Sequence, residues 1–312
     1  MILVLRSLGI GELATAVPAL RGLRAAFPRR TLALAAPGWL APLVDLVAGV
    51  DRLVPVDGLA PAGSLPVRPP YWAVNLHGRG PESHRLLRAT DPVTLCAFAC
   101  PEAGHLDGPT WLAEEHEVHR WCRLLDWYGI PADPGDLSLL RPHPDRLPEG
   151  ATVVHPGARH PGRRWPVARF ARLARALAAR GHQVVVTGSA ADAPLAREVA
   201  RLAGLPAGAV LAGTTDVEGL AAVIAHARLM VSGDTGAAHL ATAYRTRSVV
   251  LFGARSPGRW GPPADRAEHR VLWHPEVAPD ARLRAITVEE VLAAVDQPGR
   301  PTAASTSLSR SR

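Results

Sequence analysis

Short apolar runs of strand length alternate along this chain with stretches of helical periodicity, and the alternating series occurs twice. In the first series we expect strands at residues 1–5, 31–35, 53–56 and 72–76, with helices at 13–27 and 39–48. Regular alternation of strands and helices favours a parallel sheet with helices on both faces. Two such series predict an α/β fold made of two doubly wound units.

A segment rich in Pro, Asp and Gly separates the two series. It spans residues 126–150 and contains five prolines, too many for a long helix. We therefore place the domain boundary at its end, with one Rossmann-like domain at 1–148 and a second at 149–297, and the length of 312 residues fits two domains. Residues 298–312 are rich in Ser, Thr, Pro and Arg, and we expect them to form a disordered tail.

The second series continues the same pattern. We expect strands at 152–155, 183–187, 209–211, 229–232 and 248–252, and helices at 167–179, 193–203, 217–227 and 237–243, the third of them capped by Asp216. Ligands of doubly wound sheets bind at the carboxyl ends of the strands. The cleft between the two units is therefore the predicted site.

Composition excludes several kinds of chemistry. All 35 basic residues are Arg, so catalysis by a lysine is excluded. The net charge is +7, but Arg300, Arg310 and Arg312 lie in a tail without acidic residues, which leaves +4 for the rest and disfavours nucleic acid as a partner. No apolar run approaches the roughly 18 residues of a membrane span. The three cysteines lack CxxC spacing and no cleavable leader is evident, so we expect a reduced, cytoplasmic setting.

A dinucleotide fingerprint is present but incomplete. Gly9, Gly11 and Ala14 form G-x-G-x-x-A between a strand and a helix, yet no acid follows at the end of the second strand to bind a ribose. This absence disfavours NAD, while Arg29 and Arg30 leave NADP open. Glycines that only turn the chain are favoured over both.

A second glycine-containing turn, S-G-D-T-G at 232–236, leads into a helix. Free backbone N–H groups and the positive helix end suit a diphosphate, and Asp234 could bind sugar hydroxyls. The alternative is that Asp234 caps the helix and His239 packs in an interface.

Two further loops are candidate binding elements. Arg159, Arg163 and Arg164 follow a strand and could clamp phosphate oxygens, or could form a solvated charge run. The sequence N-L-H-G-R-G at 75–80 could bind an acceptor, or could be an ordinary loop.

Metal and serine chemistry have no support in the sequence. The H-x-x-H pair His116 and His119 lacks a third ligand, Cys96 and Cys100 lack histidine neighbours at zinc spacing, and no D-x-D motif occurs. No G-x-S-x-G motif is present either, which excludes a serine-triad hydrolase of that type. We therefore expect neither a metal nor a cofactor.

A series of short motifs runs along most of the chain, and the most specific is D-T-G-A-A-H-L-A at 234–241. The others are G-E-x-x-x-A-x-P-A-L at 11–20, N-L-H-G-R-G at 75–80, H-P-G-A at 155–158, R-W-P at 164–166, V-V-V-T-G-S at 184–189, L-A-G-T-T at 211–215, L-F-G at 251–253 and W-G-P at 260–262. In their order and spacing, these motifs resemble those of the heptosyltransferases, glycosyltransferase family 9, of bacterial surface-polysaccharide synthesis.

The resemblance implies a GT-B architecture in which the first domain binds an acceptor and the second a nucleotide sugar. It also implies inversion at the anomeric carbon without a metal. Glu12 stands where the family's proposed base is usually Asp, and Arg163 stands where Lys is frequent. The family's threonines just upstream correspond here to Ala158 and Arg159.

From this resemblance we expect a defined set of site residues. The catalytic residues are Glu12, Arg163 and Asp234; the donor-binding residues are Gly11, Arg164, Gly188, Asp192, Thr235, Gly236 and His239; the acceptor-side residues are Asn75, His77 and Arg79. We expect the donor to be an ADP-sugar whose sugar is heptose-like. We expect the acceptor to be a hydroxyl group of a glycan or of a lipid-linked molecule. We expect a cytoplasmic monomer with peripheral contact at the inner membrane face. Two alternatives remain: a nucleotide-sugar epimerase of the same architecture and a non-catalytic nucleotide-sugar binder.

Overall fold

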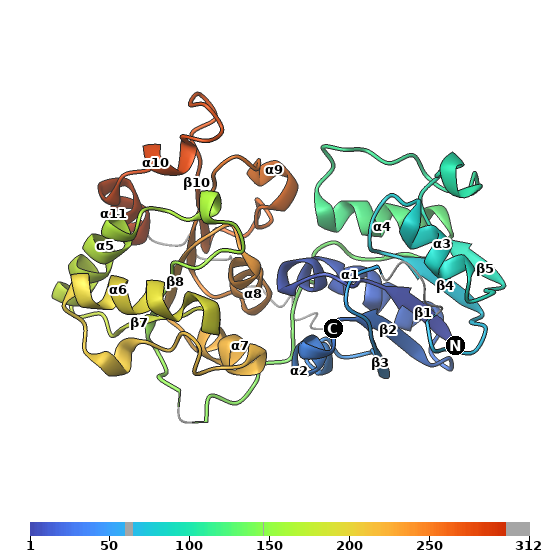
Figure 1. Ribbon diagram of the computed structural model, residues 1–312, viewed down its shortest axis with the longest axis horizontal. Coiled ribbons are helices and arrows are strands. Elements are labelled where there is room, and N and C mark those ends of the chain that lie inside the picture. The colour runs from blue at the N-terminus through green and yellow to red at the C-terminus, as the bar shows by residue number, and fades with distance from the viewer. Residues whose placement is uncertain (60–64, 146, 298–312) are drawn as a thin grey trace, which may run out of the picture.

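The computed structural model describes residues 1–59, 65–145 and 147–297, and it contains two parallel sheets covered by helices (Figure 1). The predicted tail, 298–312, lies outside the described residues. The strands of the first sheet are β1 (Ile2–Leu5), β2 (Leu32–Ala36), β3 (Arg52–Pro55), β4 (Trp72–Asn75) and β5 (Thr94–Cys96), and the helices that follow them are α1 (Ile10–Ala26), α2 (Ala41–Asp45), α3 (Glu82–Arg88) and α4 (Glu117–Trp127).

The second sheet repeats the alternation. Its strands are β6 (Thr152–His155), β7 (Val184–Val186), β8 (Leu229–Gly233), β9 (Ser248–Leu251) and β10 (His269–Leu272), and its helices are α5 (Val167–Ala179), α6 (Ala193–Ala203), α7 (Val217–Ala225), α8 (Gly236–Tyr244), α9 (Pro257–Trp260), α10 (Arg282–Ala285) and α11 (Val288–Asp296). Strand pairing is parallel within both sheets.

The strand order determines where each sheet can bind a ligand. The first sheet has the order β3-β2-β1-β4-β5, so the winding reverses between β1 and β4. The second has the order β10-β9-β8-β6-β7 and reverses between β6 and β8. A crevice opens beyond the carboxyl ends of the strands at such a reversal. The loops after β1, β4, β6 and β8 are therefore the ones placed to form a site.

The predicted strand at 209–211 is wrong as a strand. The chain forms a 3₁₀ turn at Ala207–Ala209, and only Val210 pairs with Val186, as an isolated parallel bridge. Proline and glycine on the amino-terminal side of this run leave too little extended chain for a ladder. The bridge occupies the position beside β7 where the third strand of a Rossmann-like sheet would lie.

Helix α1 begins three residues earlier than predicted. The Glu12 carboxylate accepts a hydrogen bond from the Gly9 backbone N–H at 3.2 Å, which satisfies one of the free donors at the helix start. Pro18 consequently lies in the interior of the helix, not near its first turn, and is buried.

Other differences from the predicted elements follow from local composition. The helix expected at 39–48 is a 3₁₀ turn, Gly38–Leu40, followed by the short α2, which has a proline in its first turn. Helix α4 was not predicted: charged residues interrupt its apolar ones, although Trp121 and Leu125 form part of a buried stripe at helical spacing.

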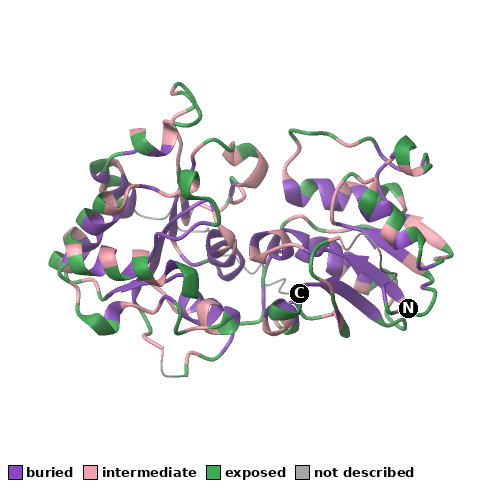
Figure 2. Cartoon of the chain, viewed as in Figure 1, coloured by how far each residue is buried: buried purple, intermediate pink, exposed green. Residues whose placement is uncertain are grey.

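The central strands of each sheet are buried on both faces, as parallel sheets favour (Figure 2). In β1, Ile2 and Val4 enter one apolar cluster while Leu3 and Leu5 enter another on the opposite face. The continuous apolar runs of the sequence are therefore strands with no solvent-facing side.

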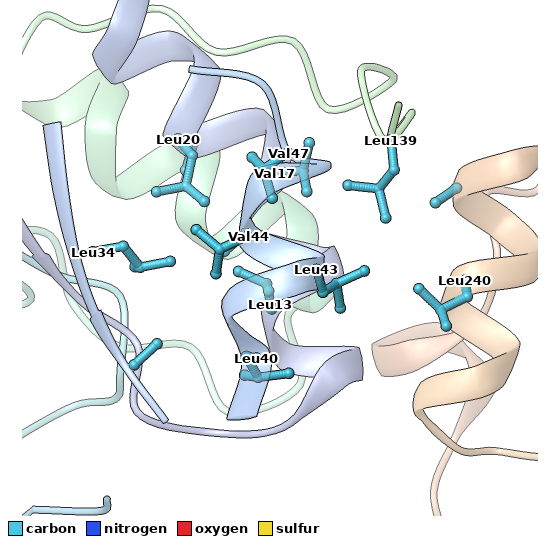
Figure 3. Packing of buried hydrophobic residues seen from close by; sticks show 14 of the residues in the cluster. Leu13, Val17, Leu20, Leu34, Leu40, Leu43, Val44, Val47, Leu139 and Leu240 are labelled. Carbon is cyan, nitrogen blue, oxygen red and sulfur yellow. The ribbon is translucent and has the colours of Figure 1, made fainter. Parts of the chain in front are cut away.

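One apolar cluster continues from the first sheet across the domain interface. Figure 3 shows Leu13 and Val17 of α1 beside Leu43 of α2, with Leu240 of α8 reaching toward them from the second domain. The chain itself crosses from one sheet to the other between α4 and β6, and the boundary at residue 148 stays a prediction. Arg141 in this segment donates a hydrogen bond to the carbonyl of Ala225.

A glycine contact between α1 and α8 brings the two domains together at their helix starts. A Cβ atom on Gly236 would lie 2.7 Å from Cβ of Ile10 and 3.1 Å from the backbone N of Gly11. A Cβ on Gly11 would lie 2.7 Å from Cδ2 of His239. Only glycine at both positions allows the two helix starts to meet without displacement.

We predict that Gly236→Ala lowers the free energy of unfolding by about 1–3 kcal/mol, because the added methyl group overpacks the contact with Ile10. Gly208→Ala is the matched control, since a Cβ there would meet no atom within 4 Å. Urea unfolding of both variants measures the difference. A Gly236→Ala protein as stable as Gly208→Ala would show that the interface yields to the methyl group.

Candidate active site

The site lies where the amino ends of α1 and α8 meet. Both helices start directly after central strands, α1 beyond β1 and α8 beyond β8, at the winding reversals of the two sheets. Each helix start presents unpaired backbone N–H groups and a partial positive charge. The glycine contact brings these two ends together at one cleft, an arrangement that favours an anionic ligand.

Two adjacent cavities of about 630 and 620 Å³ form this cleft. They share lining residues from both domains, namely Ile10, Trp39, Ala158, Arg159, Thr235 and Gly236. We call the first, which also contacts Glu12, the central cavity, and the second, which extends over β7 and the start of α7, the lateral cavity. A further cavity of about 690 Å³ beside β10 and α11 contains none of the predicted site residues.

Glu12 lies on the first-domain wall of the central cavity. Its Oε2 accepts the hydrogen bond from Gly9, so the side chain has the helix-end role that competes with a catalytic one. Its Oε1 makes no hydrogen bond with any residue that the structure describes. One carboxylate oxygen therefore fixes the side chain and the other is available to a ligand.

Arg6, which was not predicted as a site residue, is buried behind this wall and hydrogen-bonds to it. The side chain is 1% exposed, and Nε donates to the Glu12 carbonyl at 2.8 Å. The other nitrogens donate to the Leu76 carbonyl, to Oγ1 of Thr15 at 3.1 Å and to Glu117 at 3.2 Å. Burial lowers the pKa of Arg6, and the carboxylates of Glu117 and Glu12 oppose that shift. An arginine at the end of a buried strand was the available signal.

His77 is the second polar group of the first-domain wall. Burial, together with the positive charge of Arg6, lowers its pKa to about 4, while Glu12 acts in the opposite direction. Its Nδ1 is buried and has no partner among the described residues. At neutral pH the ring is therefore uncharged and retains a free polar atom. Arg79, two residues on, is exposed and does not line either cavity.

Asn75 is placed to support this loop instead of facing the cleft. It is fully buried, and its amide nitrogen lies 2.9 Å from Oγ of Ser83 and 3.2 Å from the carbonyl of Gly78. Its Oδ1 accepts from the His77 backbone N–H at 3.0 Å. These contacts use the polar atoms of Asn75 internally, and its side chain lines neither cavity, so its acceptor-side role stays a prediction.

Arg163 and Asp234 form an ion pair on the second-domain wall. One guanidinium nitrogen donates to Oδ2 of Asp234 at 2.5 Å and to its backbone carbonyl at 2.6 Å. Asp234 is 8% exposed. The pair lines the central cavity opposite Glu12 and joins the loop after β6 to the loop after β8.

A similar pair lines the lateral cavity. Arg164 donates to the Ala158 carbonyl at 2.9 Å and to Asp192 at 3.3 Å, and Asp192 also accepts a 2.6 Å hydrogen bond from the Ser189 hydroxyl. A Cβ on Gly188 would lie 2.8 Å from Cβ of Asp192. Gly188 and Asp192 therefore pack as one unit at the cavity wall.

Thr235 and His239 complete the start of α8. The Thr235 hydroxyl is buried and has no hydrogen-bond partner in the described part of the chain. Burial lowers the pKa of His239, although Asp234 and Glu12 favour its charged form. Its ring packs edge-on against Trp260, with ring centroids 5.9 Å apart.

Trp39 is a cleft residue that the sequence analysis did not single out. It is 55% exposed and lines both cavities from the first domain. A tryptophan immediately after a buried strand and a Pro-Gly turn was the signal that could have found it.

The described residues contain neither a cluster of metal ligands nor a membrane-spanning helix. No group of three or more His, Cys, Asp or Glu side chains there could hold a metal ion. No helix of the described chain is both long enough and apolar enough to span a bilayer.

The sequence of this chain is similar to those of known proteins. The family model described as glycosyltransferase family 9 (heptosyltransferase) matches residues 113–286, just over half of the chain. Lipopolysaccharide heptosyltransferase 3 of Escherichia coli is 37% identical over 112 residues, which are 35% of this chain and 33% of that protein. The alignment with lipopolysaccharide heptosyltransferase 2 of Salmonella typhimurium strain LT2 is longer, 26% identical over 292 residues, 82% of this chain and 83% of the relative.

A solved structure supports the fold. E. coli ADP-heptose LPS heptosyltransferase II superposes with a TM-score of 0.74 at 22% identity, covering 94% of this chain and 97% of that one. This likeness, with the two parallel sheets, confirms the predicted GT-B type α/β fold.

We predict that His155 makes the stability of the protein fall on acidification. Burial lowers its pKa to about 4, whereas an unfolded histidine titrates near 6.5. Below pH 6.5 the unfolded chain binds a proton that the folded chain does not, so unfolding becomes easier until pH falls to about 4. For this residue the loss between pH 7 and pH 5 is roughly 2 kcal/mol.

Urea unfolding at both pH values checks this. His155→Gln should show a smaller stability difference between the two pH values than wild type, and His143→Gln, whose side chain is 82% exposed, should match wild type. An undiminished difference in His155→Gln would contradict the assignment.

Proposed function

Because the chain belongs to glycosyltransferase family 9, the heptosyltransferase family, we propose that it transfers a heptose-like sugar from an ADP-linked donor to a hydroxyl acceptor. We propose further that the transfer inverts the anomeric carbon and needs no metal ion. The observation that carries the proposal is the cleft itself, in which a carboxylate at the start of α1 shares a cavity with the start of α8 and an arginine loop of the second domain.

The donor is assigned to the second-domain side of the cleft. Its diphosphate would lie at the start of α8, where backbone N–H groups of Thr235 and Gly236 can stabilise negative charge. Asp234 would orient the sugar hydroxyls and Arg163 would fix Asp234. The preference for ADP is supported by the name of the solved relative, an ADP-heptose enzyme.

Glu12 is assigned as the general base. Its free carboxylate oxygen takes the proton of an acceptor hydroxyl as that oxygen forms a bond to the anomeric carbon. The bond from the anomeric carbon to the diphosphate breaks at the same time, and the nucleoside diphosphate leaves with the electron pair. In this scheme the acceptor oxygen would attack from the first-domain side and the leaving group would depart toward the second, on opposite faces of the sugar, as inversion requires.

The acceptor is assigned to the first-domain side. The uncharged His77 lines the central cavity next to the Glu12 wall, and its unpartnered Nδ1 can hydrogen-bond a sugar hydroxyl. We propose a cell-surface glycan or lipid-linked acceptor. Such an acceptor would bring a cytoplasmic, monomeric enzyme into peripheral contact with the inner membrane face.

Nucleotide binding tests this proposal directly. Melting the protein with ADP, GDP, UDP and dTDP should reveal one preferred nucleotide, since a ligand at 100 times its dissociation constant adds about 2.7 kcal/mol. ADP-heptose should then release ADP in the presence of an acceptor, equally with and without EDTA, and yield the opposite anomer.

An intact epimerised donor would indicate an epimerase, and binding without turnover would indicate a non-catalytic binder. Loss of activity in EDTA with recovery in magnesium would contradict the metal-free mechanism.

Substitution of Glu12 tests its role as the base. We predict that Glu12→Gln lowers kcat by about 10²- to 10⁴-fold, because an amide cannot accept the proton, while ADP affinity stays near wild type. Glu12→Asp should give an intermediate loss, since it retains a carboxylate but withdraws it by one methylene.

Thermal melting separates this role from the helix-end role. If Glu12 served only as a charge at the start of α1, Glu12→Gln would lose less than about 1 kcal/mol of stability and almost no rate. That outcome in single-turnover transfer would remove Glu12 as the base.

A further inference from the structure

The three arginines in the loop after β6 have different surroundings. Arg163 is held by the carboxylate and carbonyl of Asp234, at 2.5 and 2.6 Å. Arg164 donates to the Ala158 carbonyl and to Asp192. Each of these two positive charges is therefore already matched by a carboxylate.

Arg159 has no such partner. It is exposed, and no hydrogen bond or ion pair joins its guanidinium to another residue in the described ranges. It also lines both the central and the lateral cavity, together with Thr235 and Gly236 at the start of α8. Its charge is thus available at the junction of the two cavities.

The charge balance of the cleft makes this unmatched cation significant. Among the described residues that line the two cavities, five are carboxylates and four are arginines; they are Glu12, Asp57, Asp192, Asp216 and Asp234, and Arg159, Arg163, Arg164 and Arg255. A diphosphate would add further negative charge to this set. A cation that is not neutralised by a neighbouring carboxylate would offset this charge, in addition to the backbone N–H groups at the start of α8.

Only one other arginine of the set lacks a carboxylate partner in the described chain. Arg255 lies over the ring of Trp260, 5.3 Å from its centroid, and lines the central cavity alone. It is absent from the lateral cavity, where Gly188, Asp192 and the start of α7 form the wall. Arg159 is therefore the better placed of the two for a group that spans both cavities.

We propose that the Arg159 guanidinium binds the diphosphate of the nucleotide donor, and that Arg163 and Arg164 are positioning residues that hold Asp234 and Asp192. The inference rests on the proposed function for the identity of the ligand. The planar guanidinium can donate two parallel hydrogen bonds to phosphate oxygens.

Measuring the affinities of several variants for two ligands tests the proposal. Calorimetric titration of wild type, Arg159→Ala and Arg159→Lys with ADP and with adenosine separates the phosphate contact from the rest of the site. We expect Arg159→Ala to weaken ADP binding by about 10- to 100-fold, the range for losing a charge-assisted hydrogen bond, with adenosine affinity changed less than about twofold. Arg159→Lys should recover part of the loss, since it keeps the charge without the paired donors.

Two matched arginine variants serve as controls. Arg197→Ala on α6 removes the same charge from an exposed position outside both cavities, and should bind ADP like wild type. Arg255→Ala removes the other unmatched charge of the cleft. A loss of ADP affinity in Arg255→Ala with none in Arg159→Ala would overturn the assignment.

The remaining outcomes are also decisive. Equal losses for ADP and adenosine in Arg159→Ala would show a general disturbance of the site and reject a specific phosphate contact. If wild type binds ADP and Arg159→Ala binds it equally well, this inference alone fails. If wild type binds none of ADP, GDP, UDP and dTDP, the proposed function fails first and the inference fails with it.

Discussion

The contact between Gly11 and Gly236 is the constraint on which the rest of the cleft depends. Because neither residue has a side chain, α1 and α8 approach closely at their amino ends, and a methyl group on either would meet an atom of the other domain at 2.7 Å. The contact directs two positive helix ends at the same space. Both winding reversals therefore open on one cleft, and an apolar cluster shared by the two domains supports them from behind.

Around this contact, carboxylates and arginines fix the walls of the cleft. Arg6 joins the loops after β1 and β4 to α4, while Arg163 with Asp234 joins the loops after β6 and β8. Removing one member of a buried pair leaves the other charge without compensation, so such pairs hold geometry strongly even where they add little net stability. Within the described ranges, four polar groups at the cleft have no hydrogen-bond or ion-pair partner: one oxygen of Glu12, the buried Nδ1 of His77, the buried hydroxyl of Thr235 and the guanidinium of Arg159.

Much of the fold could be predicted from the sequence, because parallel strands that are buried on both faces appear in the sequence as continuous apolar runs. The runs at 152–155 and 167–179 match β6 and α5 to the residue, and the Asp216 cap accepts its expected backbone hydrogen bond from Gly219 at 2.8 Å. The elements that were predicted wrongly or missed are those whose secondary structure depends on tertiary contacts. The run at 209–211 pairs with β7 through a single residue, and the buried stripe of α4 is interrupted in the sequence by charged residues.

For the site, the sequence by itself determined which loops carry polar and small residues, and hence the candidates Glu12, His77, Arg163 and Asp234. Only the tertiary structure decided how these groups are used. Asn75 bonds to the loop after β4 and to Ser83 of α3, and Arg163 is matched by Asp234, 71 positions away in the chain. Arg159, at the junction of the cavities, has no carboxylate partner in the described part of the chain. The physical reason is that a residue's type and spacing define what it can bind, whereas its partner, its burial and its remaining charge depend on residues brought near by the folded chain.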